Sequence, residues 1–441
     1  MYKNNSSVEL IGKLTRPLLL QGPIGGFFKH LMKEFKECGA TPFKINFNGG
    51  DQYDMRGLEE NVINYTEPMI KFGEFFRSFV IKNKIDGVVL FGDCRQLHQI
   101  AIEIANEMNI QVFVFEEGYV RPNYITLELK GVNANSPLMG NIEEDIRNYK
   151  FNTKNEEEQL KVLQSKHFHS IKDMASKAIK YWFFMEFKKN QFKYYKHHKD
   201  ENIYKSLWYW GKAYFNKKIY KKKESWIEDY VKKELHKKYF LVALQVYNDS
   251  QIQNHSKFKN NKKFIYETMV SFKKNANEAD FLIIKQHPLD VAYHNYDKFI
   301  KNLSKLLGLE NRIFYVHDLH LPTLIKNSKG LITINSTTGL SALYHKTPVI
   351  TLGKSLYNIK GLCFQYGLDK FWKAKSQVNF NTFKKFRSFL INKTQIVGSF
   401  YNENYYPEII KKEQKKIAVN KLKEVIKIDR NLVEDSLVKK K

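Results

Sequence analysis

The stretch from Val88 to Pro122, VVLFGDCRQLHQIAIEIANEMNIQVFVFEEGYVRP, decides the expected fold of this chain. Its pattern predicts a β-α-β unit, because two short apolar runs flank a segment with helical periodicity. The expected strands are Val88–Phe91 and Val112–Phe115, and the expected helix is Gln99–Met108. A second strand that follows a helix in this way usually pairs in parallel with the first, so the stretch indicates an α/β domain.

Polar residues follow both strands of this unit. The first strand ends at Gly92-Asp93, and the second ends at two adjacent carboxylates and a glycine, Glu116-Glu117-Gly118. In open α/β sheets the ligand lies outside the carboxyl ends of the parallel strands, so these acids are candidate site residues. The alternative is a loop of solvated acids, or an acid that caps the next element.

The composition indicates an anionic partner. The chain has 441 residues, 43% of them hydrophobic, and a formal net charge of +27. Such an excess of cations suits nucleic acid, an acidic membrane surface or charged substrates. The sequence contains no run of 18 apolar residues, so it does not predict a transmembrane helix. The three cysteines match neither a disulfide framework nor a zinc site, which fits a reducing cytoplasm.

The residues before Val88 extend the same pattern. Strands are expected at Pro17–Leu20 and Phe43–Phe47, and a glycine-rich turn, Gln21–Gly26, joins the first of them to a helix over Phe27–Cys38. Such a turn lets backbone come close to a ligand, although this one is neither a Walker A loop nor GxGxxG. With the two strands of the central unit, four strand ends of similar character predict a parallel sheet with one functional edge.

Residues 176–226 interleave aromatic side chains with lysines, as in Tyr181-Trp182-Phe183-Phe184 and Trp208-Tyr209-Trp210. This pattern is typical of single-stranded nucleic-acid binding, of a membrane interface, or of helices that pack aromatics on a core and solvate their lysines. Between the two functional alternatives we favour the membrane, since the rest of the chain does not resemble a nucleic-acid-binding fold.

A second α/β pattern begins near Lys238. The expected strands end before polar or glycine-containing turns, and they are Tyr239–Leu244, Phe281–Lys285, Ile313–Val316, Gly330–Ile334 and Pro348–Leu352. Hydroxyls, an imidazole and backbone N–H groups at such ends suit a nucleotide phosphate. The candidate donor-binding residues are Gln245, Asn248, Lys285, His287, Pro288, Ser336, Thr337, Thr338 and Gly339. No Asp-x-Asp pair near them suggests a metal.

Together these patterns predict an α/β fold of the GT-B type, in which two Rossmann-like domains face a cleft. The expected domains are an acceptor and catalytic domain at 1–150, a basic aromatic helical segment at 151–235, a nucleotide-sugar domain at 236–375 and a basic helical tail at 376–441. We also place Gln21, Gly22, Gly25, Arg95 and Arg121 on the acceptor side of that cleft.

Five segments resemble the capsule polysaccharide biosynthesis family: QGPIGGFF, VVLFGDCRQLHQIAIEIA, VFVFEEGYVRPNYITLE, KQHP and INSTTGLSALYHKTPVITLG. The resemblance covers nearly the whole chain, except the basic aromatic segment and the tail. It implies transfer of β-Kdo, with retention, from CMP-Kdo to lysophosphatidylglycerol at the start of a capsule's Kdo linker. It also implies catalysis by an acid pair before a glycine, which falls here on Glu116 and Glu117.

Relatives that add further Kdo residues often have Glu-Asp-Gly where this chain has Glu-Glu-Gly, so the nucleophile is left open. Our hypothesis is that Glu117 acts as nucleophile or base, Glu116 as its partner and Asp93 as a supporting acid. Neither metal nor other cofactor is expected. The expected partners are CMP-Kdo, an anionic inner-membrane lipid and other capsule biosynthesis or export proteins, with the chain peripheral on the cytoplasmic face of the inner membrane.

Two other classes of function compete with this hypothesis. One is a non-catalytic, membrane-associated scaffold of the capsule assembly and export complex. The other is nucleic-acid binding, which the charge and the aromatic residues would suit and which would show a steep dependence on salt. We expect neither, because the paired acids and the phosphate-binding turns both indicate an enzyme.

Overall fold

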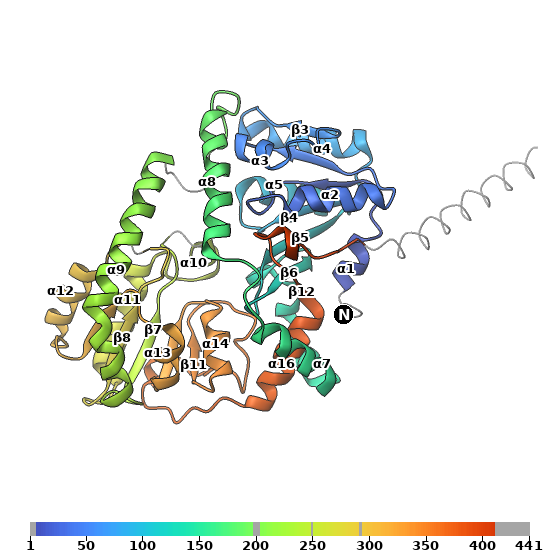
Figure 1. Cartoon of the computed structure of the whole chain (residues 1–441). Helices are drawn as coiled ribbons and strands as arrows, with labels where there is room; N and C mark the ends of the chain where they lie inside the picture. The colour runs from blue at the N-terminus through green and yellow to red at the C-terminus, as the bar shows by residue number, and fades with distance from the viewer. Residues whose placement is uncertain (1–5, 197–202, 248–249, 291–292, 411–441) are drawn as a thin grey trace, which may run out of the picture. The chain divides into compact units, whose positions relative to one another are not determined.

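The computed structural model describes residues 6–196, 203–247, 250–290 and 293–410, and the chain folds into two compact units (Figure 1). Both units are assembled from separate stretches. Among the described residues the first unit comprises 6–132, 161–196 and 392–410, and the second unit comprises 133–160 and 203–391 with the gaps given above.

A seven-stranded sheet in the order β12-β6-β5-β4-β1-β2-β3 forms the centre of the first unit. The five strands from β5 to β3 run parallel, whereas β6 and β12 are antiparallel to their neighbours. The strands are β1 (Pro17–Leu19), β2 (Phe43–Asn46), β3 (Val62–Asn64), β4 (Gly87–Phe91), β5 (Gln111–Glu117), β6 (Tyr124–Leu129) and β12 (Gln395–Val397). The expected parallel sheet is confirmed, with the central unit as β4-α5-β5.

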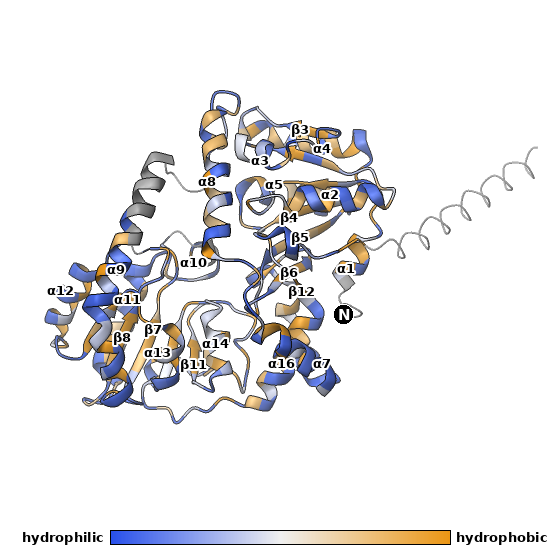
Figure 2. Ribbon diagram, viewed as in Figure 1, coloured by the Kyte–Doolittle hydropathy of each residue, from blue (hydrophilic) through white to orange (hydrophobic). Residues whose placement is uncertain are grey.

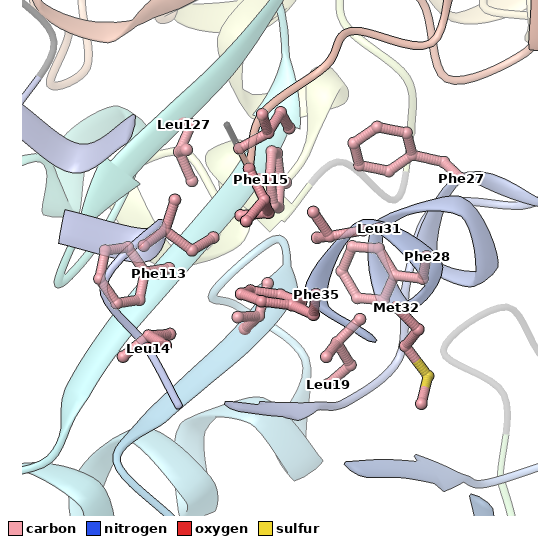
Figure 3. Close-up of a cluster of buried hydrophobic side chains, with 14 of the residues drawn as sticks. Leu14, Leu19, Phe27, Phe28, Leu31, Met32, Phe35, Phe113, Phe115 and Leu127 are labelled. Carbon is pink, nitrogen blue, oxygen red and sulfur yellow. The ribbon is translucent and has the colours of Figure 1, made fainter. Parts of the chain in front are cut away.

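The helices of the first unit cover this sheet. They are α1 (Ser6–Ile11), α2 (Phe27–Glu37), α3 (Gly49–Asp54), α4 (Phe72–Asn83), α5 (Gln96–Glu107) and α8 (Ile171–Phe187), with 3-10 turns at η1 (Met69–Lys71) and η4 (Glu403–Tyr405). The core lies between α2 and the sheet. Figure 3 shows side chains of α2, including Phe27, Leu31 and Phe35, directed toward Phe113 and Phe115 of β5, and all five are fully buried.

The second unit contains a five-stranded parallel sheet in the order β11-β10-β7-β8-β9. Its strands are β7 (Tyr239–Ala243), β8 (Phe281–Lys285), β9 (Ile313–Val316), β10 (Gly330–Thr333) and β11 (Val349–Thr351), all within a residue or two of the expected strands. Figure 2 colours β7 and β8 as hydrophobic, which agrees with their burial inside this unit. A parallel strand buried on both faces is expected to be apolar throughout.

Helices and turns surround the second sheet. They are η2 (Asn133–Asn135), η3 (Pro137–Gly140), α6 (Ile142–Asn148), α9 (Ile203–Lys233), α10 (Ser250–His255), α11 (Asn261–Asn275), α12 (Asp297–Leu307), α13 (Leu321–Asn327), α14 (Thr338–Tyr344) and α15 (Leu368–Phe371). Two helices, α7 (Thr153–Gln164) and α16 (Phe380–Thr394), contain the points at which the chain passes from one unit to the other.

The domain limits expected from the sequence differ from these units. The basic aromatic segment is not one body, because α8 belongs to the first unit and α9 to the second. Tyr181 of α8 is buried beside α3, whereas Ile227 and Val231 of α9 are buried in the second unit. The buried side chains of each helix therefore determine the unit to which that helix belongs. The side chains of Trp208-Tyr209-Trp210 lie outside the described residues.

The expected helical tail at 376–441 begins with a helix, α16, but the expectation is wrong for the residues that follow this helix. After α16 the chain forms the strand β12, in which Ile396 pairs with Ile125 of β6 and is buried. Pairing with the exposed edge of β6 satisfies backbone groups that would otherwise be free, which is the physical reason for a strand at this place. Residues 411–441, with the rest of the expected tail, lie outside the described part of the chain.

Candidate active site

Glu116 and Glu117 are the last two residues of β5, and both are partly buried. The strand ends beside β4, since Gly92 donates its backbone N–H to the carbonyl of Phe115 over 2.9 Å. The backbone N–H of Glu117 donates to Oε1 of Glu116, also over 2.9 Å. The two carboxylates are thus held at the carboxyl edge of the parallel strands, where ligands of α/β sheets bind.

The protonation of Glu116 is shifted by its surroundings. Burial raises the pKa of its carboxyl to about 7, and the charges of Glu117 and Asp93 raise it further, whereas the Glu117 N–H and the Arg95 guanidinium lower it. A buried carboxyl near other carboxyls favours its neutral form. A group that is half protonated near neutral pH can both accept and donate a proton, as a general acid–base residue must.

Glu117 is fixed by a tyrosine from the far end of the chain. The hydroxyl of Tyr401 donates to Oε1 of Glu117 over 2.6 Å. Burial raises the pKa of Tyr401 well above its ordinary value, and the charge of Glu117 adds to this, so the phenol remains a donor. The His169 ring packs against Tyr401 with 5.1 Å between ring centroids, and its Nδ1 lies 2.9 Å from Oγ of Ser399.

Asp93, Arg95 and His98 follow β4, the strand that pairs with β5. Asp93 is buried, and its Oδ2 accepts the backbone N–H of Val132 over 3.0 Å. Arg95 immediately precedes α5, and its guanidinium lies 5.6 Å from the ring centroid of Phe91. His98 is fully buried, its Nδ1 lies 2.6 Å from the Gly92 carbonyl, and burial lowers its pKa to about 3. A neutral His98 therefore orders the loop that carries Asp93.

The second unit contains a cavity of about 890 Å³ at the carboxyl edge of its sheet. Lys285, His287 and Pro288 line it after β8, and Thr338 lines it at the start of α14. Burial lowers the pKa of Lys285 to about 8, while the charges of Asp318 and Glu224 oppose this shift. The Lys285 ammonium donates to the carbonyl of His317 over 3.1 Å. The cavity thus offers a cation and hydroxyls to an anionic ligand.

A family model described as "Capsule polysaccharide biosynthesis protein" matches residues 86–401, a range that includes both sites. The chain belongs to this family. It is 37% identical over 405 residues to the capsule polysaccharide export protein KpsS of Escherichia coli, across 91% of this chain and 100% of that protein. It is 36% identical over 413 residues to the capsule polysaccharide modification protein LipB of Neisseria meningitidis serogroup B, across 92% and 96%.

Matches to solved structures are weaker. The β-Kdo 2,7 transferase KpsC of Thermosulfurimonas dismutans is 14% identical across 92% of this chain and 99% of that structure, with a TM-score of 0.45. A glycosyltransferase of Rickettsia africae is 12% identical across 92% and 98%, with a TM-score of 0.34. Scores at this level assign neither fold nor activity, so family membership rests on the sequence relatives.

Several donor residues expected from the sequence support the cavity without lining it. Ser336 donates its hydroxyl to Oγ1 of Thr338 over 3.0 Å, and its carbonyl accepts the Tyr357 hydroxyl over 2.5 Å. Gln245 exchanges two hydrogen bonds with Asn335, of 3.0 and 3.1 Å. These contacts hold the turn after β10. Thr337 and Gly339 belong to the same turn, and Asn248 lies outside the described residues.

Gly339 has a steric role. A Cβ at this position would lie 2.4 Å from the Tyr357 hydroxyl, so only glycine lets the first turn of α14 pack on that ring.

The acceptor residues expected from the sequence separate into three places. Gln21 is buried, and its Nε2 donates to the carboxylate of Asp51 and to the hydroxyls of Tyr181 and Tyr195. Gly22 packs on the Phe28 ring, which a Cβ would approach to 2.7 Å. These two residues therefore contribute to packing within the first unit.

The other three acceptor candidates lie closer to open surface. Gly25 lines a second cavity, which basic side chains surround. Arg95 acts electrostatically on Glu116, and the exposed Arg121 donates from Nε to the Gly118 carbonyl over 3.0 Å. Only glycine fits at position 118, because a Cβ there would lie 2.2 Å from the carbonyl oxygen of Tyr124.

Tyr401 and His169 are site residues that reasoning from the sequence missed. Neither lies in a local motif, and both are more than 50 positions from the acid pair. Only the pairing of β12 with β6 brings Tyr401 to Glu117. Within the described residues no group of three or more His, Cys, Asp and Glu side chains could hold a metal ion. Among the same described residues no helix is long and apolar enough to cross a membrane.

Proposed function

We propose that this chain is a retaining glycosyltransferase of the GT-B type that moves a β-Kdo residue from CMP-Kdo to lysophosphatidylglycerol. The observation that carries the proposal is the acid pair at the end of β5, with the pKa of Glu116 raised to about 7 and Glu117 held by Tyr401. Family membership supports a role in capsule polysaccharide biosynthesis, and the cavity in the second unit supports an anionic, nucleotide-bearing donor.

The reaction breaks the bond between the anomeric carbon and the phosphate oxygen, and CMP leaves with the bonding electron pair. The Lys285 ammonium and the Thr338 hydroxyl stabilise this phosphate. The acceptor hydroxyl forms the new bond, and its proton passes to a carboxylate. Retention requires either two successive displacements through a carboxylate or attack on the face that CMP leaves. Glu117 serves as nucleophile or base, Glu116 relays the proton, and Asp93 supports both.

Exposed aromatic side chains support contact with a membrane. Phe183 and Phe187 lie one turn apart on α8, are 54% and 71% exposed, and stack with 6.1 Å between ring centroids. On α9, Phe215 and Trp226 are 65% and 56% exposed among lysines. Aromatic rings beside cations suit the headgroup region of an anionic bilayer. We therefore propose that the protein lies on the cytoplasmic face of the inner membrane, and its family membership supports contact with other capsule proteins.

The test incubates purified protein with CMP-Kdo and a short-chain lysophosphatidylglycerol, followed by mass spectrometry of the lipid. We expect the mass of one added Kdo with the wild type, and no product with Glu117→Gln, which should still bind CMP. Glu103→Gln, an exposed change on α5, is the matched control and should retain activity. Unchanged turnover of Glu117→Gln would contradict the assignment, and absence of both transfer and CMP-Kdo hydrolysis in the wild type would favour the scaffold.

A further inference from the structure

A basic pocket of about 330 Å³ lies in the first unit, and neither Glu116 nor Glu117 lines it. It is lined by Gly25, Gly26, Lys29, His30, Lys33, Tyr53, Asp54, Arg56, Lys177, Lys180, Glu403 and Tyr406. Five of these side chains are lysine or arginine and two are acidic, so the lining has an excess of positive charge. All the lining residues belong to the same compact unit.

The cations of the pocket come from three elements that converge. Lys29 and Lys33 lie one turn apart on α2, and Lys177 and Lys180 lie one turn apart on α8. Arg56 follows α3. Like charges at such helical spacing repel each other, and an anion bound among them would relieve this repulsion.

Local contacts neutralise only part of this charge. Lys177 pairs with Glu403 over 3.1 Å, whereas Lys29 donates over 2.5 Å to the Arg56 carbonyl, which carries no charge. Lys33 and Lys180 are exposed and have no hydrogen bond or ion pair with any described residue. Burial lowers the pKa of Lys29, and the charges of Lys33 and Arg56 lower it further, which records the mutual repulsion.

The glycine turn contributes Gly25 and Gly26 to the lining of the pocket. Gly25 has a φ of +109°, and a Cβ there would lie 2.9 Å from Cδ of Lys177. Its N–H donates to Oδ2 of Asp54 over 2.8 Å. Burial raises the pKa of Asp54 to about 7, so this carboxyl loses part of its negative charge near neutral pH. The turn thus lets Lys177 lie close to the backbone.

One segment connects this pocket to the acid pair. Residues 399–406 carry Tyr401, which donates to Glu117, and also Glu403 and Tyr406, which line the pocket. The Phe27 ring packs edge-on against Phe400 and Tyr406, with centroids 4.9 and 5.6 Å apart. A ligand bound by the cations would therefore contact the same segment that fixes the acid.

We propose that this pocket binds the phosphate of a phosphate ester and that its occupant is the phosphodiester headgroup of the lysophospholipid acceptor. The choice of occupant rests on the proposed function. Several lysines and an arginine around a glycine turn suit a phosphate, because they supply charge and N–H donors together. Free phosphate shares this chemistry, and the experiment distinguishes the two sources.

The test compares Lys33→Gln/Lys180→Gln with a matched control, Lys82→Gln/Lys161→Gln. All four lysines lie on helices, are exposed, and form no side-chain hydrogen bond or ion pair with the described residues. Both variants therefore lose two charges without losing a structural contact. Binding of monomeric, short-chain lysophosphatidylglycerol is measured by calorimetry at low salt without donor sugar. We expect the pocket variant to bind about tenfold more weakly, and the control to bind within about twofold of the wild type.

Two further ligands identify the group that is recognised. A monoacylglycerol with the same chain but no phosphate should bind equally weakly to all three proteins. Inorganic phosphate that binds as tightly as the lipid, with the same loss in the pocket variant, would support the phosphate site and identify free phosphate as its source. Equal lipid binding by the pocket variant and the wild type would overturn the proposal, as would tight binding of the monoacylglycerol.

Failure of the proposed function gives a different result. A wild-type protein that binds the lipid through this pocket but never transfers Kdo would overturn the transferase and leave the pocket in place. An active pocket variant with an unchanged KM for the lipid would overturn the pocket proposal and leave the transferase in place.

Discussion

Replacement of Glu116 by glutamine provides a test of the acid site that requires no substrate. The carboxyl lies at the end of β5, where burial raises its pKa from an ordinary value of 4.5 to about 7. Glutamine has nearly the same shape as the protonated acid and can still accept the Glu117 N–H through its amide oxygen. The variant therefore removes the titration and keeps most of the packing.

The size and sign of the effect follow from proton linkage. A carboxyl whose pKa is higher in the folded than in the unfolded chain binds its proton more tightly when folded. Its contribution to stability is full below about pH 4.5 and is lost as the pH rises through about 7. A difference of about 2.5 pKa units corresponds to about 3 kcal/mol. Relative to the wild type, Glu116→Gln should gain about this free energy of unfolding between pH 4.5 and 8.

Thermal unfolding of both proteins from pH 4.5 to 8.5 measures this change. In a unit of this size, about 3 kcal/mol corresponds to about 6 to 12 °C, so the difference in Tm between variant and wild type should grow by that amount. Glu103→Gln on the exposed face of α5 is the control and should show a difference that does not vary with pH. A pH-independent difference for Glu116→Gln, or one that shrinks as the pH rises, would refute the reasoning.

Three further changes test other parts of the structure. Gly118→Ala places a Cβ 2.2 Å from the Tyr124 carbonyl oxygen, so calorimetry should show a loss of about 3 kcal/mol in the free energy of unfolding. Both carboxylate oxygens of Glu224 contact His317, one its backbone N–H and the other its ring. Glu224→Gln replaces one of these acceptors with an N–H donor, so chemical denaturation should show a loss of about 2 kcal/mol in the free energy of unfolding. CMP affinity should fall about tenfold between pH 7 and 9 as Lys285 loses its proton near pH 8, and Lys285→Arg should remove this dependence.

Each of these predictions has a control. Gly140→Ala meets no atom within 4 Å and should be neutral, so equal losses for both glycine variants would exclude the steric explanation. Glu234→Gln lies on the exposed surface just after α9 and should leave stability unchanged. Persistence of the pH dependence of CMP binding in Lys285→Arg would show that another group titrates.

The sequence was most informative where the determinants are local. The β4-α5-β5 unit follows from apolar runs of strand length and from a helical repeat between them, and all three elements are found. The helix begins three residues before the expected Gln99, because Leu97 and His98 are also buried and continue its apolar face. The carboxylates at the end of β5 are found where the strand pattern placed them.

Long-range pairing is what the sequence did not reveal. Residues 395–397 are too few for a clear strand pattern, and their partner in β6 is about 270 positions earlier. Tyr401 could not be assigned to the acid site without that pairing. The basic pocket was missed for a related reason, since its lysines come from α2 and α8, which are separated by more than a hundred residues.

The edge strand β12 also has a consequence for biosynthesis. The first unit needs residues 395–401 to cover β6 and to supply Tyr401, yet almost all of the second unit is synthesised before them. Domains fold as units during synthesis, and closing so long a loop is slow. The acid-bearing unit therefore emerges with an open sheet edge and completes its site last. A protein truncated before β12 would retain both glutamates, leave an edge exposed to aggregation and lack the tyrosine that orients Glu117.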